Sequence, residues 1–69
     1  MKVLIALPAY NEEPGIASVL ENIISLRETS KYIIDVLVVN DGSTDETANI
    51  VQSLSFGREY ISLINHDSN

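Results

Sequence analysis

Three short apolar runs, separated by two segments with helical periodicity, constrain the fold of this chain more than any other feature. The runs cover residues 2–7, 33–39 and 60–64, and the second is rich in the β-branched residues that favour strands. Between the first two runs, apolar side chains recur at i, i+3, i+4, i+7 and i+8, as on one face of a helix. This predicted core stripe consists of Ile16, Val19, Leu20, Ile23 and Ile24. The expected order of elements is therefore strand, helix, strand, helix, strand (β-α-β-α-β).

Short polar segments predict where the two helices begin and end. Residues 12–14 contain two glutamates and a proline, which are typical of a first turn, and residues 29–31 break the first helix. Ser43 and Glu46 have the spacing of a capping box, which predicts that the second helix starts there, and Gly57 is expected to end it. The apolar face of the second helix consists of Ala48, Val51 and Leu54.

Strands that alternate with helices indicate an α/β fold with a parallel sheet. Crossovers between parallel strands are nearly always right-handed, so two successive crossovers give strand order 3-2-1 with both helices on one face. The first two strands are apolar at odd and even positions alike, as in sheets that are covered on both faces, but 69 residues can cover only one. We therefore expect residues 1–69 to be the N-terminal fragment of a single domain, although a partner chain could also cover the second face.

Composition narrows the classes of ligand and location. The formal net charge of −6 disfavours nucleic acid as a partner. Nucleotide phosphates would need a divalent cation or nearby basic residues. The chain contains no cysteine, so no disulfide or thiolate metal site reinforces it. The apolar start at residues 2–7 is too short to span a bilayer and has no signal-peptide pattern, so we expect a cytoplasmic protein.

Polar residues follow each predicted strand, at the edge where open parallel sheets bind their ligands. They lie at residues 10–12, at residues 40–44 and within an expected outgoing loop at residues 65–69. The chain has neither a dinucleotide fingerprint nor a P-loop nor a nucleophile elbow after any strand. An EF-hand is excluded because Glu46 stands at its glycine position, and a phosphatase site because Val39 stands where the nucleophilic Asp would be.

Two motifs at these strand ends resemble the opening signatures of the family-2 glycosyltransferases. They are Leu-Pro-Ala-Tyr-Asn-Glu-Glu at residues 7–13 and Val-Val-Asn-Asp-Gly-Ser-Thr-Asp-Glu-Thr at residues 38–47. Residues 65–69 resemble the start of the family's third loop. The first motif is most similar to that of the polyprenyl-phosphate hexose transferases, such as dolichol-phosphate mannosyltransferase. The resemblance implies a truncated GT-A, Rossmann-like fold.

The same resemblance implies an activity for a longer parent protein. The parent would transfer a hexose from a UDP- or GDP-sugar to an acceptor hydroxyl or a lipid phosphate, assisted by Mg²⁺ or Mn²⁺. The family's metal-binding Asp-x-Asp motif and its general base would lie beyond residues 1–69, so no catalytic or metal-ligating residue is expected here. The fragment would bind no metal by itself, and the parent would act in the cytoplasm or at the cytoplasmic face of a membrane.

By resemblance, half of the nucleotide pocket lies within the two motifs. Its expected residues are Pro8, Ala9, Tyr10, Glu12, Asp41 and Gly42. The Asp41 carboxylate would accept N–H groups of a uracil or guanine, Gly42 would let the backbone approach the ligand, and Tyr10 would stack on the base. Glu12 would accept a hydrogen bond from ribose or base, and the loop backbone at Pro8 and Ala9 would add polar groups.

Each assignment has a structural alternative. Asp41 would then serve the turn or cap the second helix, Glu12 would complement the helix dipole, and Tyr10 would anchor its loop. Ser43 and Thr44 are read as caps, Asp45 and Glu46 as solvated first-turn charges, and His66 as a surface histidine. At the level of the whole chain, the alternatives to an enzyme fragment are a weak nucleotide-binding module and a module that self-associates through its bare sheet face.

Overall fold

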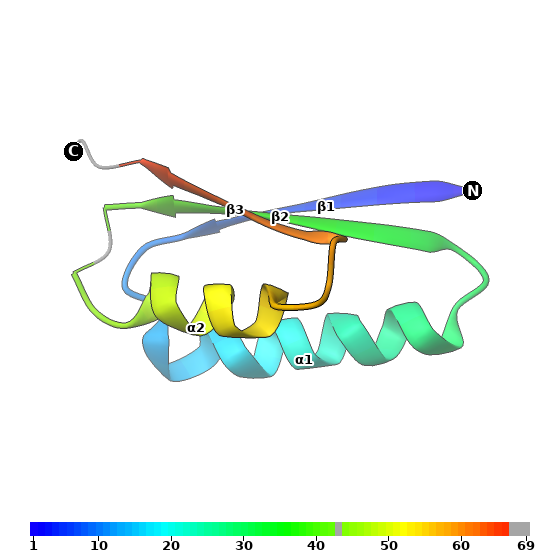
Figure 1. Cartoon of the computed structure of the whole chain (residues 1–69), viewed down its shortest axis with the longest axis horizontal. Coiled ribbons are helices and arrows are strands. Elements are labelled where there is room, and N and C mark those ends of the chain that lie inside the picture. The colour runs from blue at the N-terminus through cyan, green and yellow to red at the C-terminus, as the bar shows by residue number, and fades with distance from the viewer. Residues whose placement is uncertain (43, 67–69) are drawn as a thin grey trace.

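A computed structural model describes residues 1–42 and 44–66, in which strands and helices alternate along the chain (Figure 1). The elements are β1 (Lys2–Ala9), α1 (Glu13–Thr29), β2 (Ile33–Asp41), α2 (Thr47–Ser55) and β3 (Ile61–His66). The predicted order β-α-β-α-β is therefore confirmed.

The three strands form one parallel sheet in the order β1-β2-β3, which is the predicted order 3-2-1 counted from the other edge. Leu7 pairs with Val38 and Val38 with Leu63, so side chains from all three strands form rows across the sheet. Both helices lie on the same side of the sheet, which gives a two-layer α/β fold (Figure 1). The predicted α/β, Rossmann-like class is confirmed.

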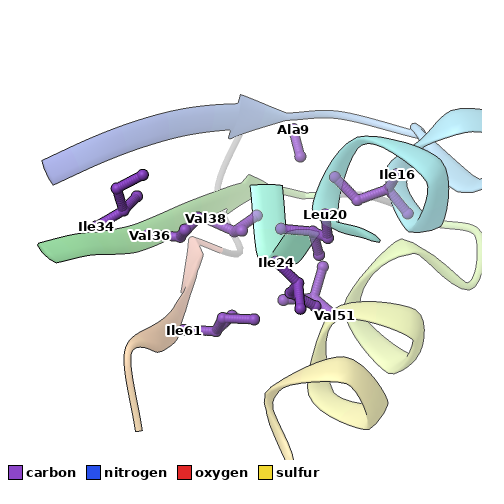
Figure 2. Close-up of a cluster of buried hydrophobic side chains, with 9 residues drawn as sticks. All are labelled: Ala9, Ile16, Leu20, Ile24, Ile34, Val36, Val38, Val51 and Ile61. Carbon is purple, nitrogen blue, oxygen red and sulfur yellow. The ribbon is translucent and has the colours of Figure 1, made fainter. Parts of the chain in front are cut away.

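A single apolar core fills the space between the sheet and the helices (Figure 2). Its nine buried residues are Ala9, Ile16, Leu20, Ile24, Ile34, Val36, Val38, Val51 and Ile61. Leu20 of α1, Val38 of β2 and Val51 of α2 are each 0% exposed. Side chains of the sheet and of both helices therefore meet at these positions. The core therefore holds both helices against the central strand.

The predicted apolar stripe of α1 is correct except at its edge. Ile16, Leu20 and Ile24 are buried and Ile23 is partly buried, but the Val19 side chain remains 44% exposed. The three buried residues lie four apart and form a narrow row that faces the sheet. The Val19 flank of the helix has no second layer to pack against within residues 1–42 and 44–66.

Arg27, near the C-terminal end of α1, contacts both β2 and the residue that precedes β3. The Arg27 Nε donates a 2.6 Å hydrogen bond to the Ile34 carbonyl of β2. The guanidinium carbon also lies 3.9 Å from the ring centroid of Tyr60, immediately before β3. The helix ends at Thr29, as the breaking segment predicted.

The start of α2 differs from the predicted capping box. The helix begins at Thr47, and Glu46 in the N-cap position makes no side-chain cap hydrogen bond. Ser43, the expected cap, lies outside the described residues. Asp45 instead accepts the Thr47 N–H at 3.0 Å through Oδ1, so the prediction of Glu46 as a capping-box residue is wrong.

The end of α2 agrees with the sequence more closely. The helix ends at Ser55, and Gly57 follows with a φ of 75°. Glycine adopts this left-handed conformation without the steric cost that a Cβ brings. The Arg58 N–H returns to the Ser55 carbonyl at 2.8 Å and closes the turn.

All three strands extend further toward their carboxyl ends than the apolar runs predicted. β1 continues to Ala9, β2 to Asp41 and β3 to His66. Asn65 and His66 were expected in a loop, but they continue the parallel ladder opposite Asn40 and Asp41. That part of the loop prediction is wrong, while residues 67–69 lie outside the described part of the chain.

The second face of the sheet is covered by no helix of the described chain. Leu4, Ile33 and Ile64 lie on this face, and their side chains are 66%, 54% and 50% exposed. This confirms the expectation that these residues cover one sheet face only. Across residues 1–42 and 44–66, neither helix combines the length and the apolar character that crossing a bilayer requires.

Candidate functional site

The carboxyl ends of the three strands bring polar side chains together at one edge of the sheet. Asn40 of β2 pairs in register with Ala9 of β1 and with Asn65 of β3. One position further along, Asp41 of β2 pairs with His66 of β3. Ligands of open parallel sheets bind at this edge, so the expected site lies where the fold class predicts it.

Asp41 is the last residue of β2 and lies in an exposed position beside a histidine. Its Oδ1 lies 3.0 Å from the His66 Nδ1, and both side chains are more than half exposed. None of the hydrogen bonds at the start of α2 involves the Asp41 carboxylate, so the alternative that it caps this helix is not observed among the described residues. Gly42 follows with a φ of 73°, which turns the chain away from the strand.

The predicted residues at the end of β1 differ in how much they present to a ligand. Pro8 and Glu12 are exposed and Tyr10 is 55% exposed. The Ala9 side chain is only 3% exposed because it belongs to the core, so Ala9 can offer a ligand only its backbone. At this exposure Tyr10 fits both the stacking role and the alternative of a half-buried loop anchor.

Two hollows at this edge are lined by three of the six predicted residues. A hollow of about 260 Å³ on the β1–α1 side is lined by Leu7, Pro8, Glu12, Gly15, Ile16 and Val19. A hollow of about 520 Å³ on the β2–β3 side is lined by Asn40, Gly42, Ala48, Asn49, Gln52, Asn65 and His66. Pro8 and Glu12 therefore lie in the first and Gly42 in the second, while Tyr10 and Asp41 line neither.

Asn40 is a polar residue of this edge that sequence reasoning did not single out. It is only 5% exposed, and its Nδ2 donates a 3.0 Å hydrogen bond to the Asn65 Oδ1. Its Oδ1 is buried and has no partner in the described part of the chain. An unsatisfied buried acceptor beside the larger hollow is available to a ligand or a water molecule. The signal was an amide directly after four consecutive apolar residues, 36–39, where a buried position was predictable.

Asp45 was predicted to be a solvated first-turn charge, and this is wrong. Its carboxylate accepts hydrogen bonds from the Thr47 hydroxyl and backbone N–H and from the Glu13 N–H. These bonds, led by that of the Thr47 hydroxyl, hold the pKa of Asp45 below its ordinary value of 3.8. Asp45 therefore links the two polar loops through hydrogen bonds.

Acidic and histidine side chains do not converge into a metal site in residues 1–42 and 44–66, where no group of three or more such residues could hold an ion. Of the acidic residues near the edge, Asp45 and Glu13 accept hydrogen bonds from backbone N–H groups, and Asp41 contacts His66. What the edge offers chemically is a set of hydrogen-bond acceptors and one exposed aromatic ring.

An open parallel sheet with polar residues at its strand ends defines an α/β domain of the Rossmann-like class. Residues 4–69 match the family model described as glycosyl transferase family 2. The chain therefore belongs to this family, as the two sequence motifs predicted.

Several curated proteins are similar to the chain. A dolichyl-phosphate beta-glucosyltransferase, ALG5C, of Trichomonas vaginalis is 35% identical over 68 aligned residues, which cover 91% of this chain and 20% of that protein. A prophage bactoprenol glucosyl transferase homolog of Escherichia coli K12 is 31% identical over 55 residues, covering 80% and 18%. A 4,4'-diaponeurosporenoate glycosyltransferase of Staphylococcus aureus is 47% identical over 49 residues, covering 71% and 12%. The chain thus spans a fifth or less of the length of these relatives.

Proposed function

We propose that this chain is the donor-binding part of a glycosyltransferase whose full-length form transfers a hexose from a UDP- or GDP-sugar. The observation that carries the proposal is the gathering of both family motifs at the carboxyl edge of one parallel sheet. Residues 1–69 would then be the N-terminal fragment of a single domain. They hold no expected general base, so the fragment would bind the donor without transferring it.

The nucleotide would lie across the ends of β1 and β2. Asp41 would accept N–H donors of the base, because its carboxylate is exposed and one of its oxygens is not engaged by His66. Gly42 would let the ligand approach the backbone, and Tyr10 would stack on the base. Pro8 and Ala9, the last two residues of β1 and not loop residues as predicted, would contribute backbone groups. Glu12 would reach the ribose or base from the rim of the smaller hollow.

The acceptor that we propose for the parent is a polyprenyl phosphate. Two of the similar proteins are named for dolichyl phosphate and bactoprenol, and the first motif resembles that of the polyprenyl-phosphate hexose transferases. A third is named for 4,4'-diaponeurosporenoate, so an acceptor other than a polyprenyl phosphate is the competing assignment. A polyprenyl acceptor would place the parent at the cytoplasmic face of a membrane.

A divalent cation would accompany the donor diphosphate in the parent. The chain carries a formal net charge of −6, so a diphosphate would be repelled without a counter-ion. Mg²⁺ or Mn²⁺ bound by carboxylates outside residues 1–69 would supply that charge. Nucleic acid is disfavoured as a partner for the same electrostatic reason.

Titration of the full 69-residue chain with UDP and GDP, followed by NMR, tests the nucleotide assignment directly. We expect chemical-shift changes at Tyr10, Glu12 and Asp41 and an affinity in the millimolar range, roughly −4 kcal/mol, because only half of the pocket is present. CDP is the matched control, because it has the same diphosphate and its base has an acceptor nitrogen where uracil and guanine have a ring N–H donor. Shifts confined to the open sheet face, or none at saturating ligand, would contradict the assignment.

The exposed sheet face supports a second candidate function, self-association without a ligand. Leu4, Ile33 and Ile64 together form an apolar surface of the kind that soluble monomers rarely leave open. Light scattering decides between the candidates, because a monodisperse monomer at high concentration would exclude association. A replacement of Leu4 with lysine should abolish any dimer and leave nucleotide binding unchanged.

A further inference from the structure

The two loops proposed to hold the nucleotide exchange hydrogen bonds through a buried threonine. Thr47, at the start of α2, is 0% exposed. Its Oγ1 accepts a 2.9 Å hydrogen bond from the N–H of Glu12, at the start of α1. Its hydroxyl donates a hydrogen bond to the Asp45 Oδ1. The direction of both bonds follows, since an amide nitrogen can only donate and a carboxylate accepts. The Thr47–Glu12 contact therefore joins residues that are 35 positions apart in the sequence.

Asp45 makes a second connection between the loops. Its Oδ2 accepts the Glu13 N–H at 3.2 Å, while its Oδ1 accepts the Thr47 N–H at 3.0 Å. One carboxylate thus binds amide groups at the starts of both helices. The depressed pKa of Asp45 agrees with this arrangement, because all of these hydrogen bonds favour the charged form.

Side chains between β1 and α1 also accept hydrogen bonds from backbone N–H groups between β2 and α2. The Glu13 Oε1 accepts the Glu46 N–H at 3.2 Å. The Asn11 Oδ1 accepts the Thr44 N–H at 2.8 Å and lies 3.4 Å from the Thr44 Oγ1. Asn11 has a φ of 50°, a left-handed conformation that asparagine tolerates better than most residues.

This exchange replaces local side-chain capping at α1 and adds to the local bond from the Thr47 N–H to Asp45 at α2. The first N–H groups of any helix lack intrahelical partners, and a preceding side chain usually satisfies them. Neither α1 nor α2 has a side-chain cap hydrogen bond from its own N-cap residue. Instead the N–H groups of Glu12 and Glu13 bind side chains of the second loop, and that of Glu46 binds a side chain of the first. We call this set of contacts the reciprocal cap.

We propose that Asn11, Glu13, Asp45 and Thr47 are positioning residues, which form the reciprocal cap and fix the distance between the two nucleotide-binding loops. Asn11 follows Tyr10 directly, and the Thr44–Thr47 segment follows the loop that begins at Asp41. The proposal rests on the proposed function in one respect, namely that these two loops bind the nucleotide. The geometry of the cap itself does not depend on any ligand.

Thr47→Val, Thr47→Ser and Asp45→Asn test the proposal in the full chain. Valine has the shape of threonine and removes both hydroxyl bonds, whereas serine keeps them. We expect amide hydrogen exchange of Glu12 to accelerate about tenfold or more in Thr47→Val and to return toward the wild-type rate in Thr47→Ser. Exchange of the Glu13 N–H should accelerate in Asp45→Asn. Glu21→Gln, on the exposed face of α1, is the matched control and should change neither rate.

Nucleotide affinity separates a positioning role from a merely structural one. We expect Thr47→Val and Asp45→Asn to lose about tenfold in UDP or GDP affinity, with Thr47→Ser close to wild type. Melting temperatures measured on the same samples show whether the chain is folded. If Thr47→Val does not fold, the nucleotide affinities of Asp45→Asn and Thr47→Ser can still be compared with that of the wild type.

The outcomes distinguish this proposal from the proposed function. Unchanged exchange of Glu12 and Glu13 in the variants would overturn the reciprocal cap, whether or not nucleotide binds. Accelerated exchange with unchanged affinity would overturn the positioning role. If the wild-type chain binds no nucleotide while the exchange rates respond as expected, the proposed function fails and the reciprocal cap remains.

Discussion

The Asp41 carboxylate and the His66 imidazole lie 3.0 Å apart, at the ends of neighbouring parallel strands. The contact engages one carboxylate oxygen and leaves the pair exposed to solvent. Exposed ion pairs and hydrogen bonds of this kind contribute only about 0–1 kcal/mol to stability. The arrangement is therefore better suited to orienting a carboxylate for a ligand than to holding the fold together.

Replacement of Asp41 by Asn should weaken donor binding without unfolding the chain. The amide keeps the size of the side chain but loses the charge and turns one acceptor into a donor, which opposes the N–H of the base. We expect at least about a tenfold loss of UDP or GDP affinity, equivalent to 1.4 kcal/mol, with little change in melting temperature. Binding is measured by NMR titration, with Glu59→Gln as a surface control. Normal binding by Asp41→Asn would show that Asp41 is a turn residue only.

Acidification should selectively remove the contribution of Asp45. Its folded-state pKa lies below 3.8, so the folded chain binds fewer protons than the unfolded chain in this range. The stabilisation is therefore complete above the ordinary pKa and is lost as the pH falls through the lower folded-state value. Urea denaturation of the wild type and Asp45→Asn should give a constant difference in unfolding free energy between about pH 5 and 7, which shrinks below pH 3.8. A difference that persists in acid would contradict the assignment.

Arg27 should stabilise the chain through geometry that lysine cannot reproduce. Its guanidinium both donates to the Ile34 carbonyl and lies over the Tyr60 ring. Removing both contacts should cost about 1–2 kcal/mol in Arg27→Ala. Arg27→Lys should recover little of this, since an ammonium lacks the planar group that bonds and stacks at once. Equal unfolding free energies for wild type and Arg27→Lys would refute the expectation.

Two leucines of α1 provide a matched test of the core. Leu20 is 0% exposed, whereas Leu26 is 52% exposed on the same helix. Leu20→Ala should destabilise the chain by about 2–5 kcal/mol, through lost burial and the cavity left behind. A core of this size is marginal, so we expect Leu20→Ala to be largely unfolded at 25 °C. Leu26→Ala should change stability by less than about 0.5 kcal/mol, and similar losses for both would contradict the described packing.

The fold was predictable because its signals are local and periodic. The spacing of Ile16, Leu20 and Ile24 predicted α1, and the apolar character of both strand faces predicted a sheet with one face uncovered. The carboxyl-end rule placed Asp41 at the correct edge. Whether Asp41 binds a nucleotide remains a prediction.

The contacts of the site were not predictable in the same way, because their partners are distant in the sequence. Asp45 and Thr47 resemble ordinary first-turn residues until the other loop is placed against them. The pairs Asn40–Asn65 and Asp41–His66 depend on the register of β3, whose last two residues are polar and were taken for a loop. Local polarity predicted a loop, but the hydrogen-bonding ladder continued through it.

The reciprocal cap has a consequence for the order of folding. Because the N–H groups of Glu12 and Glu13 are satisfied by Thr47 and Asp45, these two groups have no protein partner until the second half of the chain has docked. Contacts separated by more than 30 positions must therefore form before either helix is complete at its N-terminal end. A peptide limited to β1 and α1 should fray at Glu12 and Glu13, and during synthesis α1 would acquire a stable first turn only after Thr47 has left the ribosome.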